Sequence, residues 1–171
     1  MDEQDDRYHV EGMGDRAAPS PVSEPSSSLL PAIAAGLGAA LVGGVVWGLI
    51  VKISNYEIGI VAWGIGFVAG TAVVLATRGA KGPRLQAIAV VSALLGILLG
   101  KYLSFAFAVQ EEAKSFGESI GLISGDMFSI FRDNLDDVFS LFDLLWIGLA
   151  VFTAWRIPGH DEPEPASPRP E

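Results

Sequence analysis

Three long stretches of this chain contain no charged residue, and this feature constrains the fold more than any other. They run from Leu29 to Val51, from Ile58 to Thr77 and from Leu85 to Gly100. Each approaches or exceeds the roughly 20 apolar residues that a helix needs to cross a bilayer. A fourth stretch, residues 138–157, contains only two charges, Asp143 and Arg156. We therefore expect an all-α fold, a bundle of four transmembrane helices over about residues 30–51, 58–77, 85–106 and 138–157.

Small residues recur at every fourth position inside these stretches. The rows are Ala32, Gly36, Ala40, Gly44 and Gly48; Ala62, Gly66 and Gly70; and Ser92, Gly96, Gly100, Ser104 and Ala108. Residues four apart lie on nearly the same face of a helix, so each row forms a groove with little side chain in it. In lipid, such grooves let helix backbones approach one another. We expect the rows to pack helices within one chain, and the alternative is packing between copies in a homo-oligomer or a membrane complex.

Composition narrows the classes of function. The chain of 171 residues has a net charge of −9, which argues against nucleic acid as a partner. It has no cysteine, which excludes disulfides, thiolate catalysis and cysteine-ligated metal. The acidic, Ser- and Pro-rich residues 1–28 and the Pro- and Glu-rich residues 158–171 are predicted to be disordered tails. The first apolar stretch lacks a basic region before it, so we interpret it as a retained helix rather than a signal peptide.

One short loop is strongly basic and predicts the orientation in the membrane. Arg78, Lys81 and Arg84 lie between the second and third stretches, and such loops stay in the cytoplasm. With four spans, both tails are then cytoplasmic, in agreement with Arg156 at the end of the fourth span. Trp47 and Trp63 lie at similar distances from the first turn, and we expect them to anchor the bundle in the lipid interface.

Residues 110–137 are polar and acidic, but apolar residues recur in them at helical spacing. We expect an amphipathic helix, interrupted near Gly125, either on the outer surface of the bundle or in the outer-leaflet boundary. Asp133 or Asn134 is predicted to cap the fourth span, with Asp136 and Asp137 in its first turn.

Two ionisable residues fall inside the predicted spans. Lys101 and Asp143 each lie about five residues from the outer end of a helix, so antiparallel neighbours would place both in one layer. An intramembrane ion pair of this kind is either structural or part of a proton- or ion-coupled site. Two further alternatives are that each side chain reaches the headgroups separately, or that Lys101 pairs with Glu57 in the outer turn.

Motifs for catalysis are weak. Residues 117–121 match the Gly-x-Ser-x-Gly pattern of serine hydrolases, which has meaning only on a strand-to-helix turn with a histidine base nearby. The histidines, His9 and His160, fall in the predicted tails on the other side of the membrane. We expect no catalytic residue, no cofactor and no metal site, and therefore no enzyme.

The segment 55–66, Asn-Tyr-Glu-Ile-Gly-Ile-Val-Ala-Trp-Gly-Ile-Gly, is followed by the basic turn and by Leu85-Gln86. It resembles the YEIG…AxGIG transmembrane hairpin of a group of uncharacterised bacterial multi-pass membrane proteins, some of which carry an N-terminal zinc-ribbon or B-box-like module. The resemblance covers about residues 41–105 and implies a location in the bacterial cell membrane, but no activity. This chain lacks the cysteines of the zinc module.

These features predict a non-enzymatic integral membrane protein, in contact with lipid, that serves assembly or scaffolding or is a subunit of a complex. The alternative is a small transporter or channel subunit that uses Lys101 and Asp143.

Overall fold

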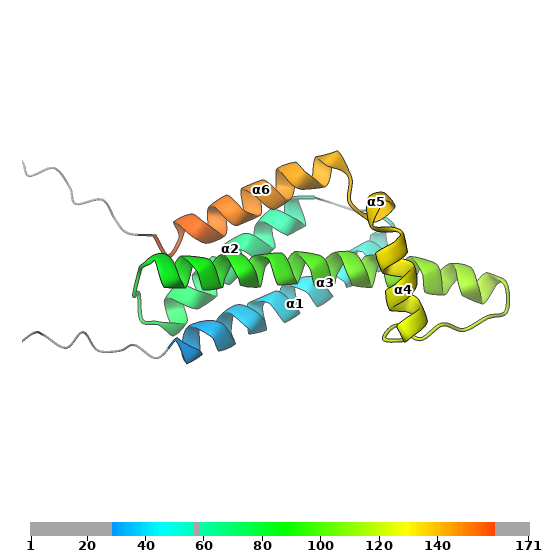
Figure 1. Cartoon of the computed structure of the whole chain (residues 1–171), viewed down its shortest axis with the longest axis horizontal. Coiled ribbons are helices and arrows are strands. Elements are labelled where there is room, and N and C mark those ends of the chain that lie inside the picture. Colours follow the sequence, from blue (N-terminus) through cyan, green and yellow to red (C-terminus); the bar gives the residue numbers. More distant parts are fainter. Residues whose placement is uncertain (1–28, 57–58, 160–171) are drawn as a thin grey trace, which may run out of the picture.

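The computed structural model describes residues 29–56 and 59–159, and its regular structure is entirely helical in these ranges (Figure 1). The helices are α1 (Leu30–Ser54), α2 (Ile60–Ala76), α3 (Pro83–Ser115), α4 (Gly125–Asp133), α5 (Leu135–Val138) and α6 (Leu141–Arg156). By length and composition, α1 and α3 can each cross a membrane, and α2 is a shorter apolar helix of 17 residues. The predicted tails 1–28 and 160–171 lie outside the described residues.

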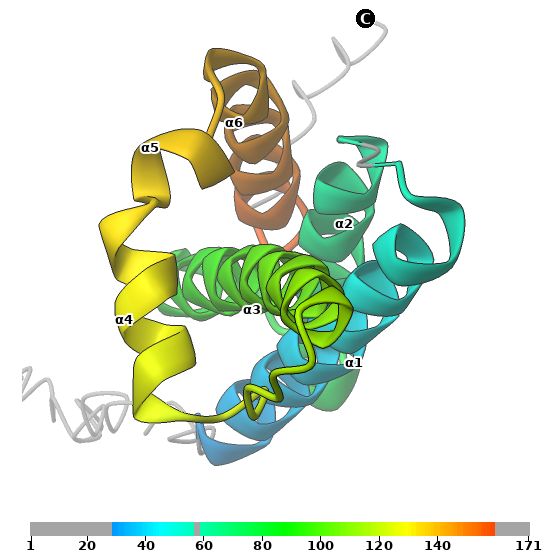
Figure 2. The same ribbon diagram turned by 90° about the vertical axis from the view of Figure 1, so that its right-hand side faces the viewer.

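Four helices, α1, α2, α3 and α6, lie side by side with alternating direction (Figure 1). We call one end of this bundle the basic end; it holds the α2–α3 turn, with Arg78 and Lys81, and the last turn of α6, with Arg156. The opposite, acidic end holds the α1–α2 turn and residues 111–137. Viewed from this acidic end, α4 lies across α3 rather than along it (Figure 2).

Hydrogen bonds to backbone carbonyls join the chain segments at the basic end. The backbone N–H of Gly82 donates to the carbonyl of Pro158 at 2.9 Å, and the side-chain amide of Gln86 donates to the carbonyl of Trp155 at 3.0 Å. Pro158 is buried, so the first residue of the predicted C-terminal tail belongs to the folded domain.

The third helix is longer than predicted. We expected it to end near residue 106, but α3 continues to Ser115. Residues 107–115 contain no glycine or proline, so nothing in them breaks a helix. The helix ends where Gly117 takes a positive φ of 78°, with the N–H groups of Gly117 and Glu118 bonded to the carbonyls of Lys114 and Ala113. This is a Schellman ending, for which glycine is the favoured residue.

The predicted amphipathic helix over 110–137 is therefore wrong in its extent. Its first residues belong to α3, residues 116–124 form a loop, and α4 occupies only Gly125–Asp133. Gly125 begins a helix instead of interrupting one, because the Ser124 hydroxyl accepts the N–H of Met127 at 3.1 Å as an N-cap.

The fourth long helix begins later than predicted. Asn134 is the N-cap residue of α5, a helix of four residues with Asp136 and Asp137 in its first turn. The chain then becomes extended at Phe139, and Ser140 caps α6, which starts at Leu141 instead of residue 138. The predicted cap and acidic first turn were thus assigned to the wrong helix. The helix α1 begins at the predicted residue, and the other bounds of α1 and α2 differ from the prediction by one to three residues.

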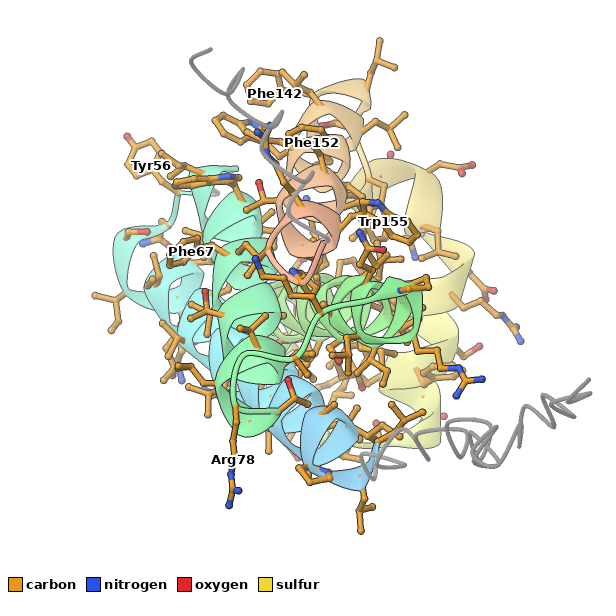
Figure 3. All side chains as sticks on the ribbon, turned by 90° about the vertical axis from the view of Figure 1, so that its left-hand side faces the viewer. Tyr56, Phe67, Arg78, Phe142, Phe152 and Trp155 are labelled. Carbon is orange, nitrogen blue, oxygen red and sulfur yellow. The ribbon has the colours of Figure 1, made fainter. Side chains whose placement is uncertain are left out.

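Residue size is distributed across the bundle in an unusual way. The buried residues of α1, α2 and α6 are mostly alanine and glycine, whereas most of their large apolar side chains are exposed. Phe67, Phe152 and Trp155 are examples on the outside of the bundle (Figure 3). The helices therefore pack closely through small residues and present their large apolar side chains outward.

Candidate functional site at Lys101

Lys101 and Asp143 lie together in the acidic half of the bundle. The Lys101 ammonium is 2.9 Å from one carboxylate oxygen of Asp143 and donates to the carbonyl of Val138 at 3.0 Å. The Lys101 side chain is 1% exposed and that of Asp143 13% exposed. The structure thus places the two predicted residues in one buried ion pair. Glu57, the alternative partner, lies outside the described residues.

The second carboxylate oxygen of Asp143 is used by the helix that carries it. This oxygen accepts both the N–H and the hydroxyl of Ser140 at 2.8 Å, and the Ser140 hydroxyl accepts the N–H of Asp143 at 3.2 Å. These bonds form a capping box at the start of α6. Asp143 therefore stabilises the first turn of α6 and ties that turn to α3 through Lys101.

Aromatic rings surround the Lys101 ammonium. The ring centroids of Phe139 and Trp47 lie 5.6 and 6.0 Å from Nζ, within the range of cation–π attraction. Trp47 is 1% exposed, so the prediction that it anchors the bundle in the lipid interface is wrong. Its ring instead fills the space that Gly100 leaves open, since a β-carbon on Gly100 would lie 2.8 Å from it. Among the described residues, the indole N–H groups of Trp47 and Trp146 are buried without a hydrogen-bond partner.

A hollow leads to Lys101 from the acidic end. A cavity of about 270 Å³ is lined by Asn55, Lys101, Ser104 and Asp137 together with apolar residues. A second cavity, of about 500 Å³, shares Asn55 and Ser104 with the first and reaches Lys52 and Glu111. Lys101 therefore lies in the wall of a partly polar hollow that is lined by residues of α1, α3 and α5.

The first and third small-residue rows pack against each other. A β-carbon on Gly44 would lie 2.8 Å from the carbonyl oxygen of Gly96, and one on Gly96 would lie 3.0 Å from Cα of Ala40. Gly36 lies against the Ser92 side chain, and a β-carbon on Gly48 would lie 2.7 Å from the β-carbon of Leu103. The residues of both rows therefore lie in the interface between α1 and α3.

The second row packs against α6. A β-carbon on Gly66 would lie 2.4 Å from the carbonyl oxygen of Ala150, and one on Gly70 would lie 3.0 Å from the side chain of Ile157. Next to this contact, the Trp63 indole donates to the Thr153 hydroxyl at 3.0 Å. All the predicted packing glycines thus contact neighbours within the same chain.

The basic residues of the α2–α3 turn region are exposed at the basic end. Arg78 adopts a positive φ of 56° and extends from the basic end (Figure 3). Arg84, in the first turn of α3, is exposed too, and Lys81 lies in the same turn region. Within residues 76–84 there is no acidic residue, whereas residues 111–137 contain seven and only two basic residues.

The hydrolase-like motif does not form a catalytic site in the described residues. Residues 117–121 lie in the loop after α3, which is neither the helix we predicted nor a strand-to-helix turn. Both histidines lie outside the described residues. Within residues 29–56 and 59–159, no three His, Asp or Glu side chains gather as metal ligands would.

Comparison of the chain with known protein families, with curated proteins and with solved structures finds no match. The resemblance of the 55–66 hairpin to bacterial multi-pass proteins stays a prediction.

Two parts of the Lys101 site escaped the sequence analysis. Ser140 and Asp143 form a Ser-x-x-Asp pattern, which marks a helix start and would have identified the true beginning of α6. Asn55 and Asp137 also line the hollow, but the sequence predicted no site for Asn55 and placed Asp137 only in a helix start, because both reach the hollow through the packing of α1, α3 and α5.

Proposed function

We propose that this protein is an integral membrane protein of four spans, α1, α2, α3 and α6, with both termini in the cytoplasm. The observation that carries the proposal is the inverted packing, in which glycine and alanine are buried and leucine, valine and phenylalanine are exposed. In water, so much exposed apolar surface would be costly at about 25 cal/mol per Å². In hydrocarbon that cost disappears, and close backbone packing becomes the main source of helix association.

The lengths of the helices suit this proposal. At 1.5 Å per residue, α1 is about 38 Å long and α3 about 50 Å, against a hydrocarbon core of about 30 Å. The helices α2 and α6 reach only about 26 and 24 Å. Short spans are accommodated by local thinning of the bilayer and by flanking residues that reach the headgroups.

The charges support cytoplasmic termini. Arg78, Lys81, Arg84 and Arg156 gather at the basic end, and short basic loops stay in the cytoplasm. The helix α1 begins at the basic end, and the helix α6 ends there (Figure 1).

Within the membrane we assign the protein a non-enzymatic role, as a scaffold or as a subunit of a complex. The small-residue rows are engaged inside the chain, so a partner protein would contact the outer faces or the acidic end. The Lys101–Asp143 pair then serves as a clamp between α3 and α6, because each carboxylate oxygen already has a partner.

Transport is the second candidate, and the hollow beside Lys101 is the observation in its favour. Against it, the core of the basic half is filled by apolar residues such as Ala69, Val73 and Ala93, which offer no polar path. Proton or ion flux into liposomes that contain the purified protein, abolished by Asp143→Asn, would establish transport. Absence of flux under proton and cation gradients would leave the structural role.

Extraction of native membranes tests the membrane proposal. We expect the protein to stay in the pellet after washing with alkaline carbonate and to be released by mild detergent. Release by carbonate alone would contradict it. Purification in detergent then tests the role in a complex, because a subunit brings its partners in a fixed ratio.

A further inference from the structure

An apolar groove runs between α3 and α4 in the acidic half of the bundle. It has a volume of about 620 Å³, and its lining includes Leu95, Leu98 and Tyr102 from α3 and Ile123 and Phe128 from the α4 side. Only hydroxyl groups and backbone bring polar atoms into this lining, since no charged residue takes part.

The helix α4 is fixed over this groove by a small aromatic cluster. Met127 and Phe131 are buried, and the Phe131 ring packs edge-on against Tyr102 at 5.1 Å and Phe105 at 5.6 Å between centroids. The Tyr102 hydroxyl donates to the carbonyl of Leu122 at 2.7 Å. These contacts hold α4 and the loop before it against α3, and they define the two walls of the groove.

The opposite surface of α4 is polar. Asp126, Arg132 and Asp133 are exposed, whereas Phe128 is 60% and Ile123 96% exposed toward the groove and its margin. Together with the exposed Leu95 and Leu98 of α3, these side chains form a contiguous apolar patch, and such patches mark sites of contact with another apolar surface.

The groove lies at the depth where hydrocarbon would be found if the proposed spans are correct. Leu95 and Tyr102 lie twelve and nineteen residues after Pro83, or about 18 and 28 Å along α3. With Pro83 at the inner boundary, a hydrocarbon core of about 30 Å would end near Tyr102, so the groove would open into its outer part. The helix α4, which lies across α3 (Figure 2), would then lie at the outer boundary. Leu95 and Leu98 also belong to the exposed apolar face of α3, which makes the groove continuous with the lipid-facing surface.

We infer that the groove between α3 and α4 binds the acyl chain of an outer-leaflet phospholipid. The helix α4 lies in the headgroup layer, with Phe128 directed into the hydrocarbon and its charged side directed to water, as interfacial amphipathic helices do. This inference rests on the proposed membrane location, and it adds a bound lipid and a position for α4.

Spin labels on single cysteines test the inference in the full chain, which has no cysteine of its own. Gly125 lines the groove and has open space around it, so Gly125→Cys places a label there. Gly121→Cys is the matched control outside the groove, and Leu41→Cys labels the exposed apolar face of α1. Each variant is reconstituted in vesicles of phosphatidylethanolamine and phosphatidylglycerol, and collisions with oxygen and with a water-soluble nickel complex are compared.

We expect the Gly125 and Leu41 labels to collide mainly with oxygen and the Gly121 label mainly with nickel. If the Gly125 label collided with nickel as often as the Gly121 label while the Leu41 label collided mainly with oxygen, the lipid site would be overturned and the membrane proposal would stand. A Leu41 label open to nickel would overturn the membrane proposal itself. A Gly125 label shielded from both reagents in a protein that elutes as a dimer would assign the groove to a second copy and also overturn the lipid site.

Retention of lipid provides a second readout. Leu98→Trp fills the groove, and Leu41→Trp adds the same volume to an exposed leucine of α1 outside it. In native mass spectra of the detergent-purified protein, we expect Leu98→Trp to lose one retained phospholipid per chain that wild type and Leu41→Trp keep. Equal retention in all three would contradict the inference.

Discussion

The two ends of the bundle are held together by different kinds of contact. From the middle to the basic end, the closest helix contacts are between small apolar residues, as where Gly66 meets Ala150 and Gly70 meets Ala154, and no buried charge of the described residues takes part. At the acidic end, a buried charge pair joins α3 to α6, and aromatic rings and a hollow surround it.

This difference has a physical consequence. Helix backbones that contact each other leave no space for a ligand between them, so the small-residue part of the bundle has only a structural role in this account. A buried ion pair adds less net stability than its geometry suggests, because desolvation offsets the attraction. Any binding or regulatory chemistry of the described residues is therefore expected at the acidic end, where polar groups meet open volume.

The largest expected effect follows from breaking the charge pair. Lys101→Met leaves the Asp143 carboxylate buried without its cation, and loss of one partner of a buried pair costs about 3–5 kcal/mol. We expect a clear fall in the thermal unfolding midpoint in detergent, followed by circular dichroism. Lys114→Met is the matched control, since its pair with Glu111 is exposed and is worth less than about 1 kcal/mol.

A double variant sharpens this test. Combining Lys101→Met with Asp143→Asn removes both charges, so the double variant should be more stable than the sum of the two single losses indicates. If Lys101→Met were no more harmful than Lys114→Met, the clamp between α3 and α6 would be refuted.

The next effect concerns the small-residue contacts. Gly66→Ala places a β-carbon 2.4 Å from the carbonyl oxygen of Ala150, and this backbone atom cannot rotate away. We expect a loss of about 1–3 kcal/mol in stability, as for overpacking in a core. Gly64→Ala on the same helix meets nothing within 4 Å and should leave the unfolding midpoint unchanged or slightly higher. Equal midpoints for the two variants would show that α2 and α6 do not pack as described.

The smallest effect belongs to the hydrogen bond between Trp63 and Thr153. In a double-mutant cycle of Trp63→Phe and Thr153→Val, we expect a coupling of about 0.6 kcal/mol, the average for such bonds between membrane helices. A coupling as large as that of the Lys101–Asp143 pair would remove the contrast between the two ends.

Much of this architecture could be predicted from the sequence because period and spacing are local properties. The rows of small residues identified the faces of α1, α2 and α3 that pack, and the layer shared by Lys101 and Asp143 followed from counting residues along helices. The ends of the helices were harder, since Gly117 and Ser140 act through turn geometry that competes with helical propensity.

The choice of neighbours could not be derived from spacing at all. A small-residue row does not specify its partner, so the contact of Gly66 with α6 and that of Gly44 with α3 came only from the structure. The burial of Trp47 could not be derived from spacing either, because it depends on which residue of a neighbouring helix lies opposite. An indole at that height suits a lipid interface by composition, but the opening at Gly100 gives it a place inside the bundle.

The most direct test of the membrane account is labelling of single cysteines with a membrane-impermeant maleimide in intact cells. The five sites are Ser20, Asn55, Ala80, Ser119 and Ser167, one in each segment that connects or flanks the proposed spans. The account predicts labelling of cysteine at 55 and 119 in intact cells, and of cysteine at 20, 80 and 167 only after the membrane is permeabilised. Labelling of positions 20 and 167 from opposite sides, or full recovery of the protein in the detergent-free soluble fraction, would contradict it.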